Sequence, residues 1–481
     1  MNDRRKSAYL FAMHTVLAGA LCCVFSCRTQ AQQASLPSAP PVYMLAQNNQ
    51  TPIPPMPIGP PPPMPPALQP PPSTGPLLTL AQAEQMAIRN NPHISIAHLL
   101  ALAQAQVTRQ VFSAYMPMAS TTLDAVDANN NGRITGAGTL NSPRMLDKAA
   151  GGLTVSQLIT DFGRTHNLVL SARSAAKAQL ENEVATDLDI TLTVDQAFYH
   201  ALAAQADLRA AEETVRQRQA TADQVNALTQ AKLRSDVDLA FADVQLSQAK
   251  LLELNAKNQS DDAMAALNTV LGSEQNHPYT LVDETSVTPA PPPSDAEPLV
   301  RQAFAARPDL AALNDDYASA THYSKAQRDL WMPTVSALAM VGGTPVRDDL
   351  IKSSWYSGAG ASINIPVFNG FLFNAQAREA KLRAGAAQQQ VRNLRDDIAR
   401  DVRTAVLNAQ TAFERIDVTL QMLNQSNLAL DLSQARYKIG LSSIVEITQA
   451  QLAQTDSLIA YTNARYSYQT ALAVLRYQLG Q

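Results

Sequence analysis

Two short stretches of this 481-residue chain place serine, acidic and basic side chains around a turn. The first is "AKLRSDVDLAFADVQL" (231–246) and the second is "ARYKIGLSSIVEITQAQL" (435–452). Each contains the Ser-x-x-acid pattern of a capping box, in which both side chains bind free amides at the start of a helix. The pairs are Ser235 with Asp238 and Ser443 with Glu446. Helix capping is therefore the first role that we assign to these four residues.

Four basic residues stand close to the two serines. They are Lys232, Arg234, Arg436 and Lys438, and we expect them in the last turn of each incoming helix. Cations are favoured there because they face the negative end of the helix dipole. Solvated helix-end charges are the simplest interpretation, and the pattern predicts two helix–turn–helix hairpins.

The remaining polar residues do not form a pattern with catalytic chemistry. The seven histidines are scattered, and His93 and His98 are five residues apart, which places them off one helical face. The sequence contains no H-E-x-x-H, no G-x-S-x-G and no glycine-rich phosphate loop. Asp236 and Asp238 lie at a predicted turn rather than in a recognisable cleft. We therefore predict that the protein is not an enzyme and needs no metal or cofactor.

Composition narrows the choice of partner. Hydrophobic residues make up 46% of the chain and charged residues 16%, which is ordinary for a folded protein. The net charge is −4, and Lys and Arg form no dense cluster, which argues against a nucleic-acid partner. The length suggests two to four domains.

The N-terminus has the features of a secretory signal, which we assign to residues 1–31. Arg4, Arg5 and Lys6 precede a largely apolar run over about 9–26. An uncleaved membrane anchor is the alternative, because the run approaches the roughly 20 residues that span a bilayer.

All three cysteines lie in this N-terminal segment, at Cys22, Cys23 and Cys27. The mature chain therefore has no disulfide framework and no thiolate metal site. Val24 to Cys27 resembles a bacterial lipobox, which would make Cys27 a lipidated N-terminus, and cleavage near Ala31 competes with it. The sequence leaves both processing routes open.

A proline-rich linker is predicted at 32–77. Residues 52–76 hold 14 of the 30 prolines, which favours extended polyproline II over folded structure. The segment is either a tether that holds the body away from its anchor or a linker without a specific role.

The body of the chain repeats itself. An offset of 216 residues aligns Ala87, Pro92, Ile94, Met116, Pro117 and Ser120 with Ala303, Pro308, Leu310, Met332, Pro333 and Ser336. An offset of 208 aligns Ser235, Val237, Asp238, Ala242, Ala256, Ala265, Leu267, Leu271 and Gly272 with Ser443, Val445, Glu446, Ala450, Ala464, Ala473, Leu475, Leu479 and Gly480. We predict a tandem duplication, 78–272 and 294–481, joined by a linker at 273–293.

Each half is expected to contain one very long helix. Residues 164–271 contain neither Gly nor Pro, and 371–479 contain only Gly385 and Gly440. Helices over 164–233 and 371–438 would each reach on the order of 100 Å. Small and apolar residues recur at threes and fours, which favours coiled-coil packing. A soluble coiled coil would show the same pattern.

Four segments have the alternation of β-strands, at 117–126, 152–158, 333–341 and 359–367. In the last of them small or apolar residues alternate with Gly360, Ser362, Asn364 and Pro366. The segments match the ~9 to 11 residues of a tilted transmembrane strand. Long loops are predicted at 128–150 and, in a shorter form, at 342–355.

Four strands cannot close a barrel, and an open edge in lipid leaves backbone groups without hydrogen bonds. The chain is therefore expected to oligomerise. Two copies would give eight strands with a filled interior, whereas three would give twelve strands and a lumen. Three copies are favoured if a solute must pass.

In the order and duplication of its motifs, the chain resembles the TolC-like outer-membrane efflux proteins of Gram-negative bacteria. The stretches that carry the resemblance are "LTLAQAEQMAIRNNPHI", "EPLVRQAFAARPDL", "AYMPMAS", "LWMPTVS", "ITDFGR", "PVFNGF", "ARYKIGLSSIVEITQAQL" and "ALAVLRYQLG". The resemblance implies a mainly α-helical homotrimer, in which a twelve-stranded barrel in outer-membrane lipid continues as a helical tunnel across the periplasm. It also implies a passive exit duct for a tripartite efflux pump or type I secretion system, docked to a periplasmic adaptor and an inner-membrane transporter.

The same resemblance assigns roles at the two turns. A trimer would bring Asp238 and Glu446 near one axis as a carboxylate ring that favours cations. Tyr437, Glu446 and Gln449 are the residues implied to hold the entrance closed, and Gln449 replaces an acid found in well-known members. For adaptor docking the matching positions are Ile439, Gly440 and Leu441 in the second half, and Lys232 and Arg234 in the first. Lys232 stands where that turn of the family has glycine.

A periplasmic coiled-coil adaptor or structural protein is the alternative. It would share the long helices and the signal but lack the two pairs of strands. The sequence specifies neither the exported solute nor the class of transporter.

Overall fold

The computed structural model describes residues 75–126, 148–273, 275, 277–283, 290–346 and 352–481. The predicted signal, Cys27 and most of the linker 32–77 lie outside the described residues, as does 127–147 of the first predicted loop. The chain divides into two units, Met1–Pro70 and Pro71–Gln481. The described elements all belong to the second unit.

Helices account for most of the described residues. They are α2 (Leu80–Asn90), α3 (Pro92–Phe112), α4 (Arg164–Gln230), α5 (Asp236–Val270), α6 (Glu297–Ala306), α7 (Pro308–Arg328), α8 (Leu372–Lys438) and α9 (Ile444–Gln478), with short 3-10 turns at Ser113–Tyr115 and Asp329–Trp331. The strands are β1 (Leu77–Leu78), β2 (Met118–Val126), β3 (Lys148–Thr160), β4 (Thr280–Leu281), β5 (Thr334–Val346) and β6 (Trp355–Asn364). None of the described helices carries a stretch long and apolar enough to cross a membrane.

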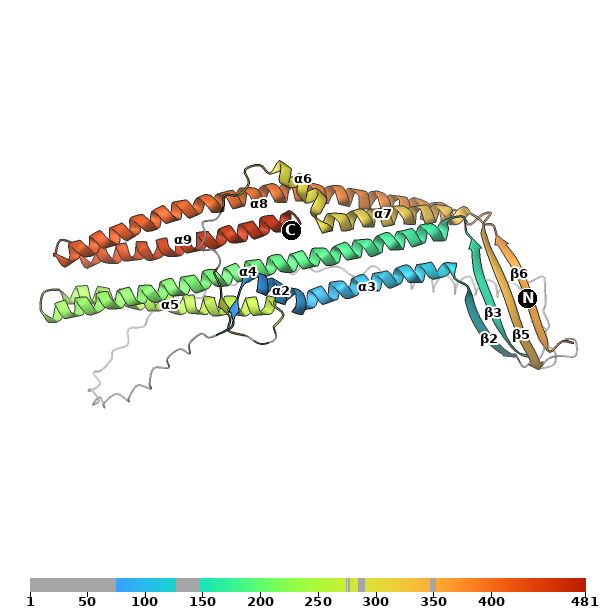
Figure 1. Ribbon diagram of the computed structural model, residues 1–481, viewed down its shortest axis with the longest axis horizontal. Coiled ribbons are helices and arrows are strands. Elements are labelled where there is room, and N and C mark those ends of the chain that lie inside the picture. The colour runs from blue at the N-terminus through green and yellow to red at the C-terminus, as the bar shows by residue number, and fades with distance from the viewer. Residues whose placement is uncertain (1–74, 127–147, 274, 276, 284–289, 347–351) are drawn as a thin grey trace, which may run out of the picture. The chain divides into compact units, whose positions relative to one another are not determined.

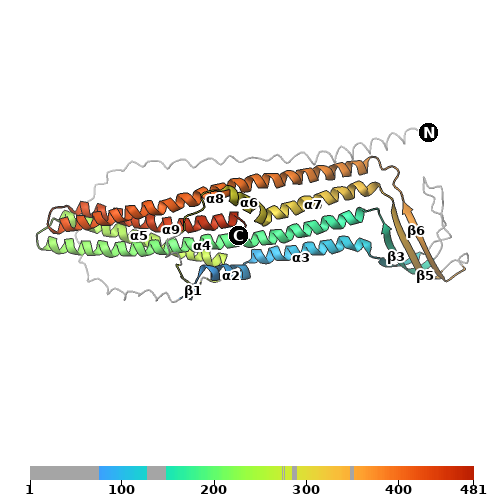
Figure 2. The same cartoon turned by 45° about the horizontal axis from the view of Figure 1, so that its top comes forward.

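The long helices α4 and α8 organise the packing (Figure 1). Near the strands α4 packs along α3 and α7, and α8 packs along α7. Beyond that point α5 and α9 return from the far turns, with α5 along α4 and α9 between α4 and α8 (Figure 2). Each long helix has 67 residues and so extends on the order of 100 Å.

The end of α4 differs from the prediction. The helix ends at Gln230 rather than 233, because Lys232 has a left-handed backbone with φ of 58°. Lys232 and Arg234 therefore lie in the turn itself, and the expectation that they occupy the last helical turn was wrong. Arg436 and Lys438 do lie in the last turn of α8.

The four predicted strands form one antiparallel sheet in the order β2–β3–β5–β6. β3 begins at Lys148 and β5 ends at Val346, so both strands extend into the predicted loops. Gly342 and Gly343, which were predicted to lie in the second loop, pair with Gly152 and Gly151 on one side and with Tyr356 and Trp355 on the other. β6 runs from Trp355 to Asn364, so it begins earlier and ends earlier than the predicted segment.

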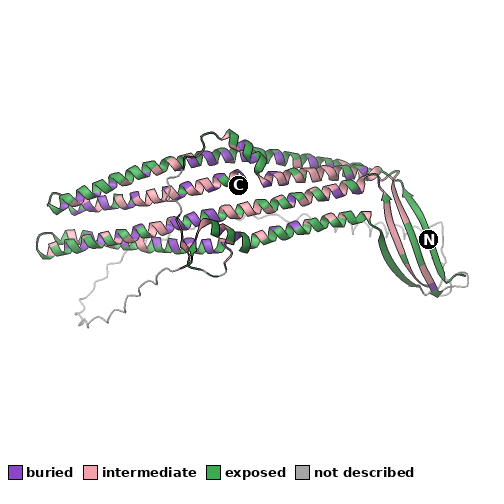
Figure 3. Cartoon of the chain, viewed as in Figure 1, coloured by how far each residue is buried: buried purple, intermediate pink, exposed green. Residues whose placement is uncertain are grey.

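One face of the sheet, the apolar face, carries mainly apolar side chains, and the other, the polar face, carries mainly polar ones. Because paired residues share a face, the register sorts the side chains. One face carries Ala119, Leu123, Leu153, Val155, Val335, Ala337, Ala339, Val341, Trp355, Ala359, Ala361 and Ile363, together with the polar Thr121, Gln157 and Ser357. The other carries Ser120, Thr122, Asp124, Thr154, Ser156, Thr334, Ser336, Tyr356, Ser362 and Asn364, together with the apolar Met118, Leu158, Leu338 and Met340. Most side chains on both faces stay partly or fully exposed in the single chain (Figure 3).

Buried side chains gather along the helices rather than on the sheet (Figure 3). One cluster joins α2, α4 and α5 around Phe198 and Leu267, and a second joins α6, α7, α8 and α9 around Leu310 and Ile398. A third cluster lies at the far turns. These clusters hold the two hairpins, α4–α5 and α8–α9, in register.

Parts of both predicted linkers are ordered. β1 pairs in parallel with β4, which joins residues on either side of the first half. The Tyr466 hydroxyl donates to Asp283 over 2.9 Å, and the Tyr468 hydroxyl donates to the Ala290 carbonyl. The described part of 273–293 is therefore fastened to α9.

Candidate functional site at the two helical turns

Both far turns have the same backbone geometry. We define the first turn as 231–235 and the second as 439–443. The amide of Leu233 donates to the Leu228 carbonyl over 2.9 Å, and the amide of Leu441 donates to the Arg436 carbonyl over 2.8 Å. Both bonds span the last helical turn, as in a Schellman motif, which places one residue in the left-handed region. That residue is Lys232 in the first turn and Gly440 in the second.

Serines cap the returning helices, but neither turn forms a full capping box. Ser235 Oγ accepts from the Val237 amide over 3.1 Å, and Ser443 Oγ accepts from the Glu446 amide over 3.4 Å. Among the described helices, both halves of a capping box are present at Thr79 and Gln82. At the two turns the acids do not return the bond, so that part of the prediction was wrong.

Glu446 is instead engaged by a basic residue of the incoming helix. Its carboxylate lies 3.5 Å from Arg436 Nε, and Arg436 Nη2 also donates to the Leu441 carbonyl over 3.4 Å. Both side chains remain partly exposed. The ion pair therefore joins the end of α8 to the start of α9 and partly neutralises the charge of Glu446.

Tyr437 faces the other hairpin. Its side chain is 4% exposed and packs with Ala222 and Val225 of α4 and with Ile444 and Ile447 of α9. Burial raises the pKa of Tyr437, and its hydroxyl has no hydrogen-bond partner among the described residues. The residue therefore joins the two hairpins of one chain.

Arg234 covers the Tyr437 ring from the first turn. Its guanidinium carbon lies 4.4 Å from the ring centroid, which is the geometry of a cation–π contact. Asp238 is close enough to raise the pKa of Tyr437, whereas Arg234 lowers it. The structure thus brings together three of the predicted residues, one from α8 and two from the first turn and α5.

A buried set of polar side chains joins α4 to α9 next to the turns. Arg218 Nη1 donates to Gln451 Oε1 over 2.7 Å, and Gln451 Nε2 donates to Thr221 over 3.1 Å. The hydroxyls of Thr214 and Thr455 lie 3.1 Å apart. Arg218 is 4% exposed and its described partners are neutral, so burial lowers its pKa. We call these residues the α4–α9 polar ladder.

The ladder was missed by sequence reasoning, although a signal was present. Polar residues recur at three- and four-residue intervals at Thr214, Arg218 and Thr221, and again at Thr448, Gln451 and Thr455. Such a stripe on a helix predicts one polar interface. The Arg436–Glu446 and Arg234–Tyr437 contacts had no such signal, because their partners lie across a turn or on another hairpin.

Gln449 and several apolar side chains remain free of these contacts. Gln449 is exposed on α9. Leu233 and Ile439 are each 70% exposed, and Leu441 is 67% exposed. The two turns therefore expose apolar side chains on either side of charged ones.

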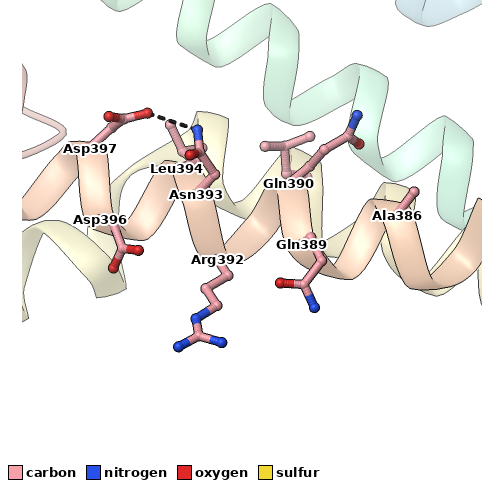
Figure 4. A pocket seen from close by; sticks show the side chains of 9 residues that line it. Ala386, Gln389, Gln390, Arg392, Asn393, Leu394, Asp396 and Asp397 are labelled. Carbon is pink, nitrogen blue, oxygen red and sulfur yellow. Dashed lines mark hydrogen bonds between the residues drawn. The ribbon is translucent and has the colours of Figure 1, made fainter.

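A concave surface lies along α8 and is lined mainly by amide and charged side chains. Gln389, Arg392 and Asp396 point away from the neighbouring helices, while Asn393 donates to Asp397 over 3.0 Å (Figure 4). Within the described residues, no three His, Cys, Asp or Glu side chains are placed to hold a metal ion.

The chain shares its fold with solved outer-membrane channels. One of them is the Campylobacter jejuni channel named CmeC. That structure superimposes with a TM-score of 0.73 at 18% identity, over 83% of this chain and 85% of that one. The likeness establishes the fold.

The sequence establishes the family. The chain matches the family described as outer membrane efflux protein over residues 84–273 and 299–481, and it belongs to that family. TolC of Escherichia coli K12 is 24% identical over 340 residues, which cover 66% of each chain. BepC of Brucella suis biovar 1 is 26% identical over 314 residues, which cover 62% of this chain and 65% of that one. The matched stretch spans just under two thirds of these relatives.

Membership confirms the predicted location of the protein and agrees with the prediction that it is not an enzyme. The family acts in the outer membrane, which is where the sequence places the protein. It is a family of transport proteins rather than of enzymes.

Proposed function

We propose that the protein is the outer-membrane exit duct of a tripartite efflux pump or type I secretion system. Three copies form a barrel continued by a helical tunnel, and solutes pass without energy input from this chain. The observation that carries the proposal is the open four-stranded sheet, whose apolar face suits lipid and whose polar face suits a water-filled lumen.

The two free edges of the sheet support ring closure. β2 and β6 are the outer strands, and successive neighbours are antiparallel, so β6 of one copy runs antiparallel to β2 of the next. Pairing them satisfies the backbone groups that an open edge would leave without partners in lipid. Three copies supply twelve strands, enough for a lumen, whereas two supply eight and fill the interior.

Unburied apolar side chains on both flanks of the helices support the same assembly. The α3 flank exposes Ile96, Leu99 and Leu100 by 52 to 63%, and the α8 flank exposes Leu407 and Leu428 by 62% and 53%. In a ring, α3 and α5 of one copy meet α8 of the next. Complete burial of such a side chain contributes roughly 1.5 to 3 kcal/mol, of which these half-exposed residues would gain about half.

Matching elements support a duplicated chain. α4 and α8 have 67 residues each, and α5 and α9 have 35 each. Their starts are offset by 208 residues, as the aligned motifs are, and the family matches the chain in two segments. We propose that the two hairpins are copies of one unit.

The turns are the proposed entrance. Tyr437, held under Arg234, keeps the two hairpins of a chain together, and Glu446 with Asp238 supplies the carboxylates of the ring. Because Arg436 pairs with Glu446, the ring is weaker than the sequence alone suggests. Gln449 and the caps Ser235 and Ser443 complete the proposed entrance.

The docking surface for a periplasmic adaptor is proposed on the same turns. Ile439, Gly440 and Leu441 contribute the second turn, and Lys232 and Arg234 contribute the first. The exposed leucines and isoleucine supply apolar area, and the basic residues favour an acidic partner surface. An inner-membrane transporter is the expected third component.

The adaptor-like alternative is disfavoured by the sheet. It required the four segments to be exposed loops, and they are paired strands instead. Membrane fractionation followed by single-channel recording in planar bilayers tests the choice. We expect the protein in the outer-membrane fraction and discrete conductance steps. A protein confined to the soluble fraction that forms no channels would favour the alternative.

A further inference from the structure

One row of residues on the polar face of the sheet is packed in an unusual way. Tyr356 on β6 pairs with Gly342 on β5, which pairs in turn with Gly152 on β3. A Cβ placed on Gly342 would lie 2.4 Å from Tyr356 Cζ, and one on Gly152 would lie 2.3 Å from Tyr356 Oη. The tyrosine ring therefore occupies the space of two missing side chains and lies along the sheet.

This packing keeps the large side chain of Tyr356 flat against the sheet. Glycine in a strand costs conformational entropy and often marks a site of close approach. Gly152 and Gly342 have no side chain on the polar face, and the ring of Tyr356, which is 38% exposed, covers both positions. Any side chain larger than hydrogen at Gly152 must lift the ring off the sheet.

We propose that Tyr356 sets the width of the conduit in the barrel, and that Gly342 and Gly152 allow it to lie flat. The proposal rests on the proposed function, because the polar face lines the lumen only if the barrel closes. Three copies would place three rings at one level. With the rings lifted, the largest solute that passes this level becomes smaller.

The two glycines are not equivalent as targets. A Cβ on Gly342 also meets the Gly151 carbonyl oxygen at 2.6 Å, so a substitution there strains the backbone. The next contact of a Cβ on Gly152 is the Val341 carbonyl oxygen at 3.1 Å, which a small shift relieves. Gly152→Ala is therefore the informative change.

The chain offers a matched control on the same face. Gly360 lies four residues after Tyr356 on β6, so both share the polar face. A Cβ on Gly360 has no other atom within 4 Å. Gly360→Ala adds the same methyl group to the same wall without touching the ring.

The test measures access from outside through the level of Tyr356. Ser362→Cys, six residues further along β6 and on the polar face, reports thiol labelling in intact cells by a small and a bulky polar reagent. This readout does not depend on whether the far turns are open. We expect Gly152→Ala to slow the bulky reagent several-fold relative to the small one, and Gly360→Ala to leave the ratio unchanged.

Removal of the Tyr356 ring tests the same role in the opposite direction. Tyr356→Ala should speed the bulky reagent, and the double variant Gly152→Ala/Tyr356→Ala should behave like Tyr356→Ala alone. Equal ratios in all variants would overturn the role of Tyr356. If even the small reagent fails to reach the introduced thiol in the chain that carries only Ser362→Cys, the proposed conduit fails instead. If the Gly152→Ala protein does not assemble, Tyr356→Ala alone tests whether the ring controls access of the bulky reagent.

Discussion

At the scale of single residues, the contact between Arg234 and Tyr437 is the most specific feature of the turns. It joins the first turn to the second hairpin, and a cation–π contact of this kind contributes about 1 kcal/mol. We expect Arg234→Ala to loosen the entrance and raise the open fraction of single channels in planar bilayers.

Arg216→Ala is the matched control for that change. Arg216 also lies on the first hairpin, but its described ion pair is local, with Glu213 on the same helix. It should leave channel opening as in the unmodified chain. If the two variants open equally often, the contact with Tyr437 does not hold the entrance.

Lys232 stores strain that glycine would release. It has φ of 58° in a turn where the second hairpin has Gly440 at 79°. A long side chain in the left-handed region costs on the order of 1 kcal/mol. We expect Lys232→Gly to raise the midpoint of thermal unfolding, whereas Lys250→Gly inside α5 should lower it. A lower midpoint for Lys232→Gly would show that the lysine side chain stabilises the turn.

Side-chain partners were the least predictable part of the site. The sequence located both turns and both serine caps, because capping is local in the chain. It could not show that Glu446 pairs with Arg436 rather than closing a capping box, since two bonds of similar strength compete. It also could not show that Tyr437 is buried, because its neighbours come from α4.

At the scale of elements, the polar ladder makes the α4–α9 contact dependent on register. Gln451 supplies an oxygen to buried Arg218, and a buried charge that loses such a partner costs about 2 to 3 kcal/mol. We expect Gln451→Leu to increase amide hydrogen exchange in the ends of α4 and α9. Thr455→Val, which removes the hydroxyl contacts with Thr214 and with the Gln451 carbonyl but leaves no buried charge without a partner, should have a much smaller effect. Unchanged exchange in Gln451→Leu would contradict the role of the ladder.

The contact of α2, α4 and α9 should depend on pH. Asp195 on α4 is 4% exposed, and burial followed by the Glu84 carboxyl raises its pKa to about 7, although Arg476 lies 3.7 Å away. The folded chain therefore holds a proton that the unfolded chain releases near pH 4. The contribution of Asp195 to the free energy of unfolding is therefore greatest below about pH 4 and is lost as the pH rises through 7.

Asp195→Asn tests this dependence. We expect thermal unfolding midpoints of the unmodified protein to fall between pH 5 and pH 8, and the variant to lose part of that slope. At pH 8 the variant should be the more stable of the two, because it buries no charge. Identical slopes would show that Asp195 does not titrate in this range.

Elements were predicted better than their ends. The absence of Gly and Pro located α4, α5, α8 and α9, and alternation located all four strands of the sheet. The ends differed where backbone pairing overrode local signals, as at Gly342 and Gly343 in β5. Register could not be predicted, because it depends on which strands become neighbours.

At the scale of the whole molecule, the single chain leaves three kinds of surface uncovered. Its sheet has two free edges, its helices expose apolar flanks, and its turns expose apolar side chains. In the proposed assembly, a ring of identical copies covers the first two surfaces. The third then stays free for the proposed adaptor.

Electron cryomicroscopy of the detergent-solubilised protein tests this account most directly. We expect a threefold particle in which β6 of each copy pairs with β2 of the next, and in which the face that carries Ala339 and Ala361 points to detergent. The Tyr356 ring and the polar face should then line the lumen. A particle without a closed barrel, or a barrel with its polar face turned to detergent, would contradict the account.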